Sequence, residues 1–295
     1  MLKPVVVVDL FAGAGGFTEG AISAGAKVAV AIDLWEPAVL LHRHNQPNVL
    51  MVQHELGNLV KDVQLIWKYL VRYRISHHIH LHGSPPCQAL SNASRTDASE
   101  GMGMIHHFLD LVDAIQPDSW SMENVVPMRR RLPEGTPSVI LNSADFGVPQ
   151  TRRRCIAGEG WEAIPTHSKE EWRSVLDALP HLADEIEGLL QMDSGRSSSK
   201  TCGVNPETGK KAGGSGPLYR NLDQPSYTIM SSPRTICVNF VKIRSLTVQE
   251  TATLQGFPAT FEWELSGLRK KDIWTAIGNA VCPPVAEAII RGIIQ

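Results

Sequence analysis

The sequence lacks several features that would place it quickly in a functional class. Its 295 residues carry 28 Lys and Arg against 30 Asp and Glu, so no excess of basic charge marks a nucleic-acid-binding protein. Its five cysteines, at positions 87, 155, 202, 237 and 282, are too far apart for a zinc knuckle or a redox pair. No apolar run approaches the ~18 residues that span a bilayer. These absences favour a cytoplasmic protein with reduced thiols and without a metal or a membrane anchor.

Strand-like and helical patterns alternate along the first half of the chain. Short apolar runs at 5–10, 28–32, 79–82 and 119–122 are typical of buried strands, and helical patterns cover 16–23, 36–44, 59–72 and 105–115. This alternation predicts an α/β protein with a parallel sheet covered on both faces. Residues 285–294 form an apolar helical pattern that we expect to dock back on the first domain.

A glycine-rich turn follows the first predicted strand, in Asp9-Leu10-Phe11-Ala12-Gly13-Ala14-Gly15-Gly16-Phe17. Glycines at such a turn let the backbone approach a ligand closely, although Thr18 breaks the dinucleotide-binding fingerprint. Asp33 ends the next predicted strand, where an acid can bind the two hydroxyls of a ribose. The pattern indicates a nucleoside cofactor, and a tight turn beside a solvated Asp is the alternative.

Three later segments carry reactive side chains. In Gly83-Ser84-Pro85-Pro86-Cys87-Gln88 two prolines stiffen the backbone before a cysteine, which is either a nucleophile or a buried thiol. Glu123 ends a predicted strand, where an acid is rare unless it is paired with another side chain or has a catalytic role. In Gln150-Thr151-Arg152-Arg153-Arg154 a strand would place Gln150, Arg152 and Arg154 on one side and Arg153 on the other, unless this is a solvated basic face.

The order of these segments resembles the DNA (cytosine-5) methyltransferase family. Two later segments extend the match: Arg244-Ser245-Leu246-Thr247 with Glu250 and Leu254-Gln255-Gly256-Phe257-Pro258, and then Gly278-Asn279-Ala280-Val281. The resemblance covers residues 5–157 and 223–294. It implies a Rossmann-like S-adenosylmethionine-dependent methyltransferase fold with a small target-recognition domain. Residues 1–157 would form the catalytic and cofactor-binding domain, 158–240 the small target-recognition domain with connectors, and 241–295 a return segment that completes the catalytic domain.

The resemblance also implies a covalent mechanism. Cys87 would add to C6 of a flipped cytosine, Glu123 would stabilise N3 with the help of Asn124, and the methyl group would then pass to C5. Arg154 resembles the arginine that contacts O2. Arg152 resembles its companion, which orders the nucleophile loop and a nearby phosphate. The segment 91–103 resembles the family's loop that closes over the flipped base.

The implied cofactor is S-adenosylmethionine. By the resemblance its site consists of Phe11, Ala12, Gly13, Gly15, Gly16, Asp33, Leu34, Glu55, Pro86, Asn279 and Val281. Asp33 would take the ribose hydroxyls and Leu34 would contact the adenine. Glu55 lies where the family usually has an Asp bonded to the adenine amino group, so this sequence departs from the pattern there. Asn279 and Val281 belong to the late segment that completes the pocket.

The implied partner is a short site in double-stranded DNA, bound by a monomer. Candidate DNA contacts are Gln88, Ser91, Arg196, Lys200, Lys210, Lys211 and Arg220, although a disordered surface loop is the alternative for the last five. The acids 170, 171, 177, 184, 185 and 187 are expected to lie away from the proposed cleft, and the cations are expected to cluster where DNA runs, at Arg129–Arg131, at Arg152 and Arg154, and from Arg196 to Arg220. A near-neutral total charge is therefore compatible with a basic cleft.

Two other functions compete with DNA methylation. The family's transfer-RNA methylating branch resembles the DNA enzymes in every catalytic segment, but Gln88-Ala89-Leu90-Ser91 resembles the DNA branch more closely. A relative that only binds DNA would have lost the nucleophile or the acid, and both Cys87 and Glu123 are present. The sequence therefore predicts a DNA cytosine-5 methyltransferase of a restriction–modification system, of a phage, or acting alone, in a prokaryotic or phage-infected cell.

Overall fold

The computed structural model describes residues 3–86, 102–192, 222–232, 235–238 and 241–294. The chain forms two compact units. The first comprises Met1–Asn142, Arg153–Thr166 and Asn279–Gln295, and the second comprises Ser143–Arg152 and His167–Gly278. The division of the chain by function into three segments stays a prediction.

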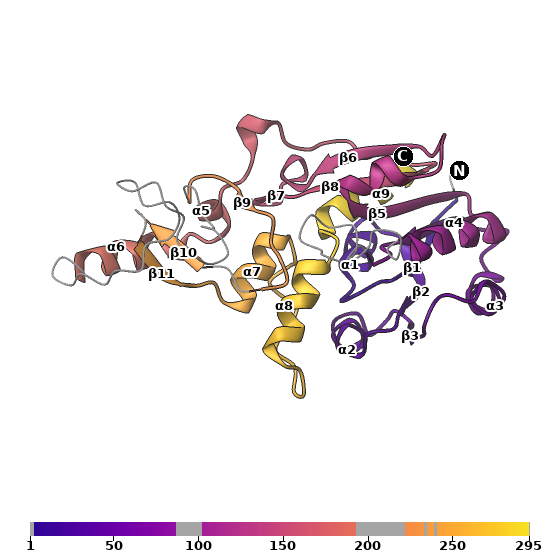
Figure 1. Cartoon of the computed structure of the whole chain (residues 1–295), viewed down its shortest axis with the longest axis horizontal. Helices are drawn as coiled ribbons and strands as arrows, with labels where there is room; N and C mark the ends of the chain where they lie inside the picture. Colours follow the sequence, from indigo (N-terminus) through magenta and orange to yellow (C-terminus); the bar gives the residue numbers. More distant parts are fainter. Residues whose placement is uncertain (1–2, 87–101, 193–221, 233–234, 239–240, 295) are drawn as a thin grey trace. The chain divides into compact units, whose positions relative to one another are not determined.

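A seven-stranded sheet in the order β3-β2-β1-β4-β5-β8-β6 forms the centre of the first unit (Figure 1). Its strands are β1 Val5–Leu10, β2 Lys27–Asp33, β3 Met51–Gln53, β4 His78–Gly83, β5 Ser119–Val125, β6 Ser138–Asn142 and β8 Arg153–Glu159. The five strands from β3 to β5 are parallel, and β8 pairs antiparallel with both β5 and β6. The predicted α/β fold with a mostly parallel, Rossmann-like sheet is confirmed.

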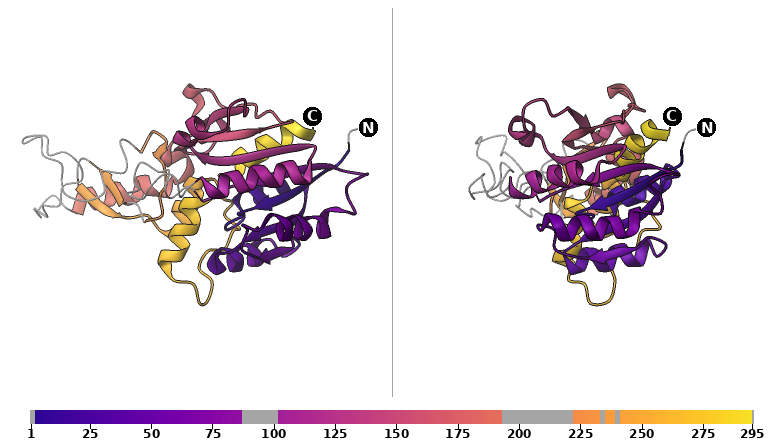
Figure 2. Two further views of the ribbon diagram at one scale, coloured as in Figure 1. Left: turned by 45° about the vertical axis from the view of Figure 1, so that its right-hand side comes forward. Right: turned by 90° about the vertical axis from the view of Figure 1, so that its right-hand side faces the viewer.

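Helices cover both faces of this sheet. They are α1 Gly16–Ser23, α2 Glu36–Asn45, α3 Leu59–Leu70, α4 Gly103–Ile115 and α9 Pro283–Ile294, with a 3₁₀ turn η2 at Val126–Arg131. Val6, Val8 and Leu81 belong to one buried cluster with Ile66 of α3 and Phe108 of α4. On the opposite face α1 packs against α9 and both contact β1, although α9 comes from the far end of the chain (Figure 2). The predicted docking of the C-terminal helix is thus observed within this unit.

The second unit contains short elements. They are η3 Ser143–Phe146, β7 Gln150–Thr151, η4 Lys169–Glu171, α5 Val175–Ala178, α6 His181–Met192, β9 Ser226–Tyr227, β10 Thr235–Val238, β11 Val241–Ser245, α7 Val248–Gln255 and α8 Lys270–Asn279. Strand β7 pairs with β9 in parallel, and β10 pairs with β11 antiparallel. Phe257, Phe261 and Trp263 pack together with ring centroids 4.5 to 4.8 Å apart, which gives the segment after α7 a small aromatic core.

Two details differ from the sequence-based expectations. Residues 150–154 do not form one strand, because β7 ends at Thr151 and β8 begins at Arg153. Among the described residues, Lys270–Ile294 is by length and composition apolar enough to cross a membrane. Since 67% of its apolar 18-residue stretch is buried, the segment is typical of core helices in a folded protein.

Candidate functional site

The glycine-rich turn after β1 adopts backbone conformations that glycine favours. Gly13 and Gly15 have φ of 57° and 93°, and Phe11 also lies in the left-handed region with φ of 55°. The Gly13 N–H donates to Oδ2 of Asp33, and the Trp35 N–H donates to its Oδ1, both at 2.8 Å. Asp33 therefore ties this turn to the end of β2. Burial raises the pKa of its carboxyl and outweighs these backbone hydrogen bonds.

Residues predicted to bind the cofactor follow the carboxyl ends of neighbouring parallel strands. Phe11 and Ala12 follow β1, Asp33 ends β2, and Glu55 follows β3. The Leu34 side chain is 54% exposed beside Asp33, so an apolar surface is available there. The carboxyl edge of an open α/β sheet is where such folds bind ligands.

Gly16 allows the late segment of the chain to reach this turn. A Cβ on Gly16 would overlap the carbonyl oxygen of Val281 and lie 3.3 Å from Cβ of Ala280. A Cβ on Gly15 would overlap Oε1 of Gln46, whose amide donates to the Gly15 carbonyl at 3.1 Å. Val281 is buried and Asn279 is exposed. The segment 279–281 is thus adjacent to the glycine turn, as the resemblance implies.

Glu123 is nearly buried at the carboxyl end of β5 and is paired with an arginine. Its Oε1 lies 3.0 Å from Nε of Arg154, which comes from the antiparallel neighbour β8. The Glu123 side chain is 9% exposed and that of Arg154 20%. The pairing gives the buried acid the partner that its position requires.

Asn124 fixes the segment that precedes Cys87. Its Nδ2 donates to the Pro85 carbonyl at 3.1 Å, and its Oδ1 accepts from the Val125 N–H at 2.8 Å. The Ser84 N–H donates to the Leu10 carbonyl at 3.1 Å. Ser84 and Pro85 are therefore anchored to β1 and β5, while Pro86 is exposed. Sequence reasoning gave Asn124 only a role beside Glu123 and missed its bond to Pro85.

Arg152 does not share a strand face with Arg154, contrary to the expected alternation. It is 3% exposed between β7 and β8, and its guanidinium donates to the carbonyls of Ile229 at 3.1 Å and Gly278 at 3.0 Å. These contacts connect distant segments of the second unit. Because the strand is interrupted at this residue, simple period-2 reasoning fails here. A catalytic role for Arg152 stays a prediction.

Several predicted residues lie outside the described part of the chain. They are Cys87, Gln88, Ser91, Arg196, Lys200, Lys210, Lys211 and Arg220. Arg129, Arg130 and Arg131 are described and exposed, at the end of η2. Within the described ranges no group of three His, Cys, Asp or Glu side chains is arranged to hold a metal ion. Cys155 and Cys282 are buried, and burial raises the pKa of the Cys155 thiol to about 11.

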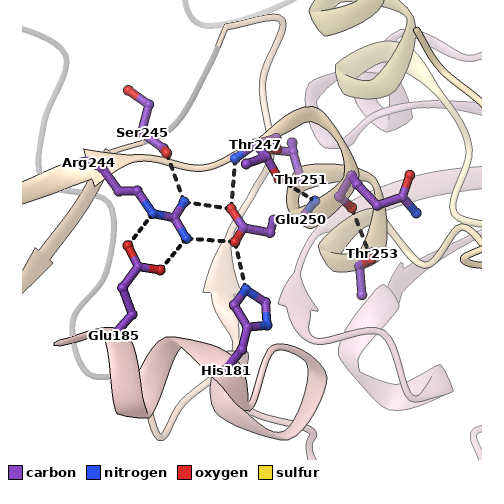
Figure 3. Close-up of polar contacts among 9 residues, drawn as sticks. His181, Glu185, Arg244, Ser245, Thr247, Glu250, Thr251 and Thr253 are labelled. Atoms are coloured by element: carbon purple, nitrogen blue, oxygen red, sulfur yellow. Dashed lines mark hydrogen bonds and ion pairs between the residues drawn. The ribbon is translucent and has the colours of Figure 1, made fainter. Parts of the chain in front are cut away.

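An ion-pair cluster organises the Arg244–Glu250 segment of the second unit (Figure 3). Arg244 contacts both oxygens of Glu185 at 2.6 and 2.7 Å and both oxygens of Glu250 at 2.7 Å. Nε2 of His181 lies 2.7 Å from Oε1 of Glu250. Glu250 also accepts from the Thr247 N–H at the start of α7, completing a capping box. The cluster joins α6, β11 and α7, and its partners Glu185 and His181 were not predicted from sequence.

Gln150 also links separate segments of the second unit, and the sequence did not reveal this role. Its amide donates to the Leu254 carbonyl at 3.1 Å and to Oε1 of Gln255 at 2.8 Å, and its own oxygen accepts from the Ile229 N–H at 2.7 Å. The side chain thereby satisfies backbone groups of α7 and of the segment after β9. Only its place beside the arginines singled it out in the sequence.

Comparison with known proteins assigns the family. A family model described as C-5 cytosine-specific DNA methylase matches residues 5–132 and 135–295. The chain belongs to this family. It is therefore a DNA cytosine-5-methyltransferase, which agrees with the prediction from the ordered motifs.

The methyltransferase has relatives that match over almost its whole length. It is 29% identical to the Type II methyltransferase M1.HphI of Haemophilus parahaemolyticus, over 98% of this chain and 86% of the relative. It is 28% identical to the Type II methyltransferase M.HindV of Haemophilus influenzae, over 98% and 96%.

Solved structures support the fold of the methyltransferase. A putative DNA modification methyltransferase encoded within an E. coli prophage aligns with a TM-score of 0.65 and 22% identity, over 98% of each chain. The Dnmt2 methyltransferase of S. pombe aligns with a TM-score of 0.65 and 18% identity, also over 98% of each chain. At these identities the likeness concerns the fold alone.

Proposed function

We propose that this methyltransferase transfers a methyl group from S-adenosylmethionine to C5 of a cytosine flipped out of a short duplex DNA site, through a covalent bond between Cys87 and C6. The observation that carries the proposal is the pair of neighbouring residues at the end of β5. Glu123 is buried and paired with Arg154, and Asn124 holds the carbonyl of Pro85, two residues before Cys87. A buried acid and an anchored nucleophile segment are the two parts that this chemistry needs.

The residues around the glycine turn fit the proposed cofactor. A Cβ added at Gly13 would meet nothing within 4 Å, so there is room beside the turn. Two carboxylates, Asp33 and Glu55, suit the ribose hydroxyls and the adenine amino group, and the exposed Leu34 suits the face of the adenine ring. Acidic groups also suit a positively charged sulfonium. When bound, S-adenosylmethionine supplies an electrophilic methyl group.

The proposed chemistry follows from the reactivity of cytosine. C5 is a weak nucleophile until a thiolate adds at C6, and a cysteine thiolate is the most nucleophilic common side chain. Negative charge then develops on the ring. Glu123 stabilises it at N3, and we assign Oε2 to this contact because Arg154 binds Oε1. Arg154 contacts O2 through a charge-assisted hydrogen bond, and Arg152 orders the nucleophile loop.

DNA recognition is assigned to the residues between the matched segments. A cytosine within a duplex hides C6, so the base is flipped out at a cost of a few kcal/mol. Phosphates are contacted by Arg196, Lys200, Lys210, Lys211 and Arg220, and the flipped site is approached by Gln88 and Ser91. The named Type II relatives support a role in restriction–modification. We infer that the enzyme acts as a monomer in the cytoplasm.

A methyl-transfer assay tests the substrate. The protein is incubated with tritiated S-adenosylmethionine and either duplex DNA or transfer RNA, and the tritium in each nucleic acid is counted. Counts are expected in DNA. Counts in transfer RNA alone would assign the enzyme to the RNA-methylating branch of its family.

Substitution of the proposed nucleophile tests the mechanism. Cys87→Ser should abolish methyl transfer while DNA binding survives. The matched control is Cys202→Ser, the same change at a cysteine outside every matched motif, and it should keep full activity. Bisulfite sequencing of DNA from cells that express the protein then gives the methylated site. Turnover retained by Cys87→Ser would remove Cys87 from its role.

A further inference from the structure

A buried carboxylate in α3 holds the segment that follows β3 and contains Glu55. Asp62 lies in the first turn of α3, and its side chain is fully buried. Its Oδ1 accepts from Nε2 of His54 at 2.7 Å, and its Oδ2 accepts from the N–H groups of Gly57 and Asn58 at 2.8 and 3.0 Å. One carboxylate therefore binds the chain on both sides of Glu55.

A second imidazole completes the surroundings of this carboxylate. Nε2 of His107 in α4 lies 2.8 Å from Oδ2 of Asp62, and His107 is nearly buried. Burial alone would raise the pKa of Asp62, but hydrogen bonds from Gly57 and from the two imidazoles outweigh it and lower the pKa. The carboxylate is therefore ionised at neutral pH. Because it only accepts hydrogen bonds, both imidazoles donate to it through Nε2.

The start of α3 has a cap other than Asp62. Asn58 is the N-cap of the helix, and its side chain accepts from the Lys61 N–H at 3.1 Å. The backbone donors that bind Asp62 belong to Gly57 and Asn58, which precede the first residue of the helix. Since a buried carboxylate is costly, these contacts indicate that its role is to fix the segment 54–58.

The side chain of Glu55 is exposed between two neighbours that point inward. Leu56, the next residue, is buried and belongs to the same apolar cluster as Ile66 of α3. His54, the residue before, is half-buried and turns its ring to Asp62. Glu55 itself is exposed. The inward contacts of its two neighbours thus direct the Glu55 side chain away from the core.

Further contacts join this segment to the end of β2. Gln53 pairs in register with Asp33, and the His54 N–H donates to the Asp33 carbonyl at 3.0 Å. Nε2 of Gln53 donates to the Leu34 carbonyl at 3.1 Å. Asp33 and Leu34 are the residues proposed above for the ribose hydroxyls and the adenine ring. Glu55 therefore lies one residue beyond the contacts that join the two strand ends, at the same edge of the sheet.

We propose that Asp62 is a positioning residue that holds the Glu55 carboxylate where it accepts from the amino group of a 6-aminopurine, and thereby makes the cofactor site selective against a 6-oxopurine. This inference rests on the proposed role of Glu55 in cofactor binding. A carboxylate accepts hydrogen bonds but donates none, so it suits an amino group and repels a carbonyl oxygen at the same position. Such a contact discriminates well only when its position is fixed, because a free side chain turns away from the wrong group at little cost.

Two ligands that differ only in the purine test this role. They are S-adenosylhomocysteine and S-inosylhomocysteine, whose purine carries a carbonyl oxygen in place of the amino group. Calorimetry gives the dissociation constant of each ligand with the whole chain. Glu55→Gln tests the direct contact, and Asp62→Ala removes its support. His54→Ala removes only the half-buried anchor, so it keeps the test decisive even if Asp62→Ala does not fold.

The ratio of the two dissociation constants is the decisive quantity. The wild type should bind S-adenosylhomocysteine at least about tenfold more tightly, since a hydrogen bond to a charged group is worth about that factor. Glu55→Gln should reduce the ratio below about threefold, because a glutamine amide both donates and accepts and so fits either purine. Asp62→Ala should reduce it similarly, and His54→Ala part of the way. At saturating S-adenosylmethionine, methyl transfer by Asp62→Ala should stay within about twofold of wild type, since the contact only binds the cofactor.

A core substitution in the same helix is the matched control. Leu70→Ala removes a buried apolar side chain eight residues further along α3. It should lower the thermal midpoint of unfolding, as Asp62→Ala does, but leave the ratio at its wild-type value. A wild-type ratio in Asp62→Ala or in His54→Ala, or a ratio lost equally in Leu70→Ala, would overturn the positioning role. A wild type that binds neither ligand, or both equally, would instead contradict the proposed cofactor contact of Glu55.

Discussion

Replacement of Arg244 by alanine should destabilise the second unit in a pH-dependent way. Arg244 satisfies both oxygens of Glu250, whose side chain is 8% exposed, and both oxygens of Glu185, which is 33% exposed. Burial alone would raise the pKa of Glu250, but hydrogen bonds from Arg244 and His181 outweigh it and lower the pKa from 4.5 to about 2. Without Arg244, a nearly buried carboxylate keeps only the Thr247 N–H and His181 as its described partners.

The structure sets the magnitude of this effect. Linkage gives about 3 kcal/mol as an upper limit for Glu250, since its pKa falls from 4.5 to about 2 on folding. The contacts with Glu185 add less because both side chains of that pair are partly exposed to solvent. Removal of one partner from a buried pair typically costs about 3–5 kcal/mol. We therefore expect a loss of about 2–3 kcal/mol in the free energy of unfolding at pH 7.

The lowered pKa of Glu250 determines how the stability difference between wild type and Arg244→Ala changes with pH. A carboxyl with a lowered folded-state pKa stabilises the protein above its unfolded-state pKa, and this stabilisation is lost as the pH falls towards 2. The gap between wild type and Arg244→Ala in urea-induced unfolding should thus be constant from pH 7 to about 5 and shrink below about 4.5. The control is Arg291→Ala, which breaks a solvent-accessible pair with Glu287 and should change stability little at any pH. A gap below about 0.5 kcal/mol at pH 7, or one that is as large at pH 3, would refute this reasoning.

Three further outcomes follow from the site. Gly16→Ala places a methyl group against the Val281 carbonyl and should weaken S-adenosylmethionine binding at least about tenfold, measured by calorimetry. The control is Gly292→Ala, whose methyl group would overlap the Glu162 backbone; it should lower stability without weakening cofactor binding. Asn124→Ala releases the Pro85 carbonyl and should lower kcat about tenfold with little change in cofactor affinity; an unchanged kcat would contradict the positioning role. DNA affinity should fall linearly on a log–log plot against salt concentration, and a flat plot would contradict a basic binding surface.

The apolar patterns predicted the sheet well because its central strands are buried on both faces. Val5–Leu10 and Gly16–Ser23 occur at their predicted bounds, since a continuous apolar run and a glycine turn mark them. Strand β3 was missed because three residues carry too little periodicity. The break at Arg152 was missed because its cause is long-range, the two backbone carbonyls that this side chain binds.

The candidate site was predictable where neighbouring residues in the sequence act together. The glycine turn and Asp33 are twenty residues apart and meet in a hydrogen bond, as a strand–turn–helix unit requires. Contacts between separate strands and helices were not predictable. The bonds of Asn124 to Pro85, of Glu185 to Arg244 and of His80 to Ser119 depend on register and packing, which residue patterns alone do not fix.

Covalent trapping tests the central claim most directly. A duplex that carries 5-fluorocytosine at the methylated position is incubated with the enzyme and S-adenosylmethionine, and the products are separated under denaturing conditions. Because elimination needs a proton at C5, a stable protein–DNA complex is predicted, with peptide mass spectrometry locating the adduct on Cys87. Cys87→Ser should give no complex. An enzyme that methylates ordinary cytosine yet forms no complex, or an adduct on another residue, would contradict the account.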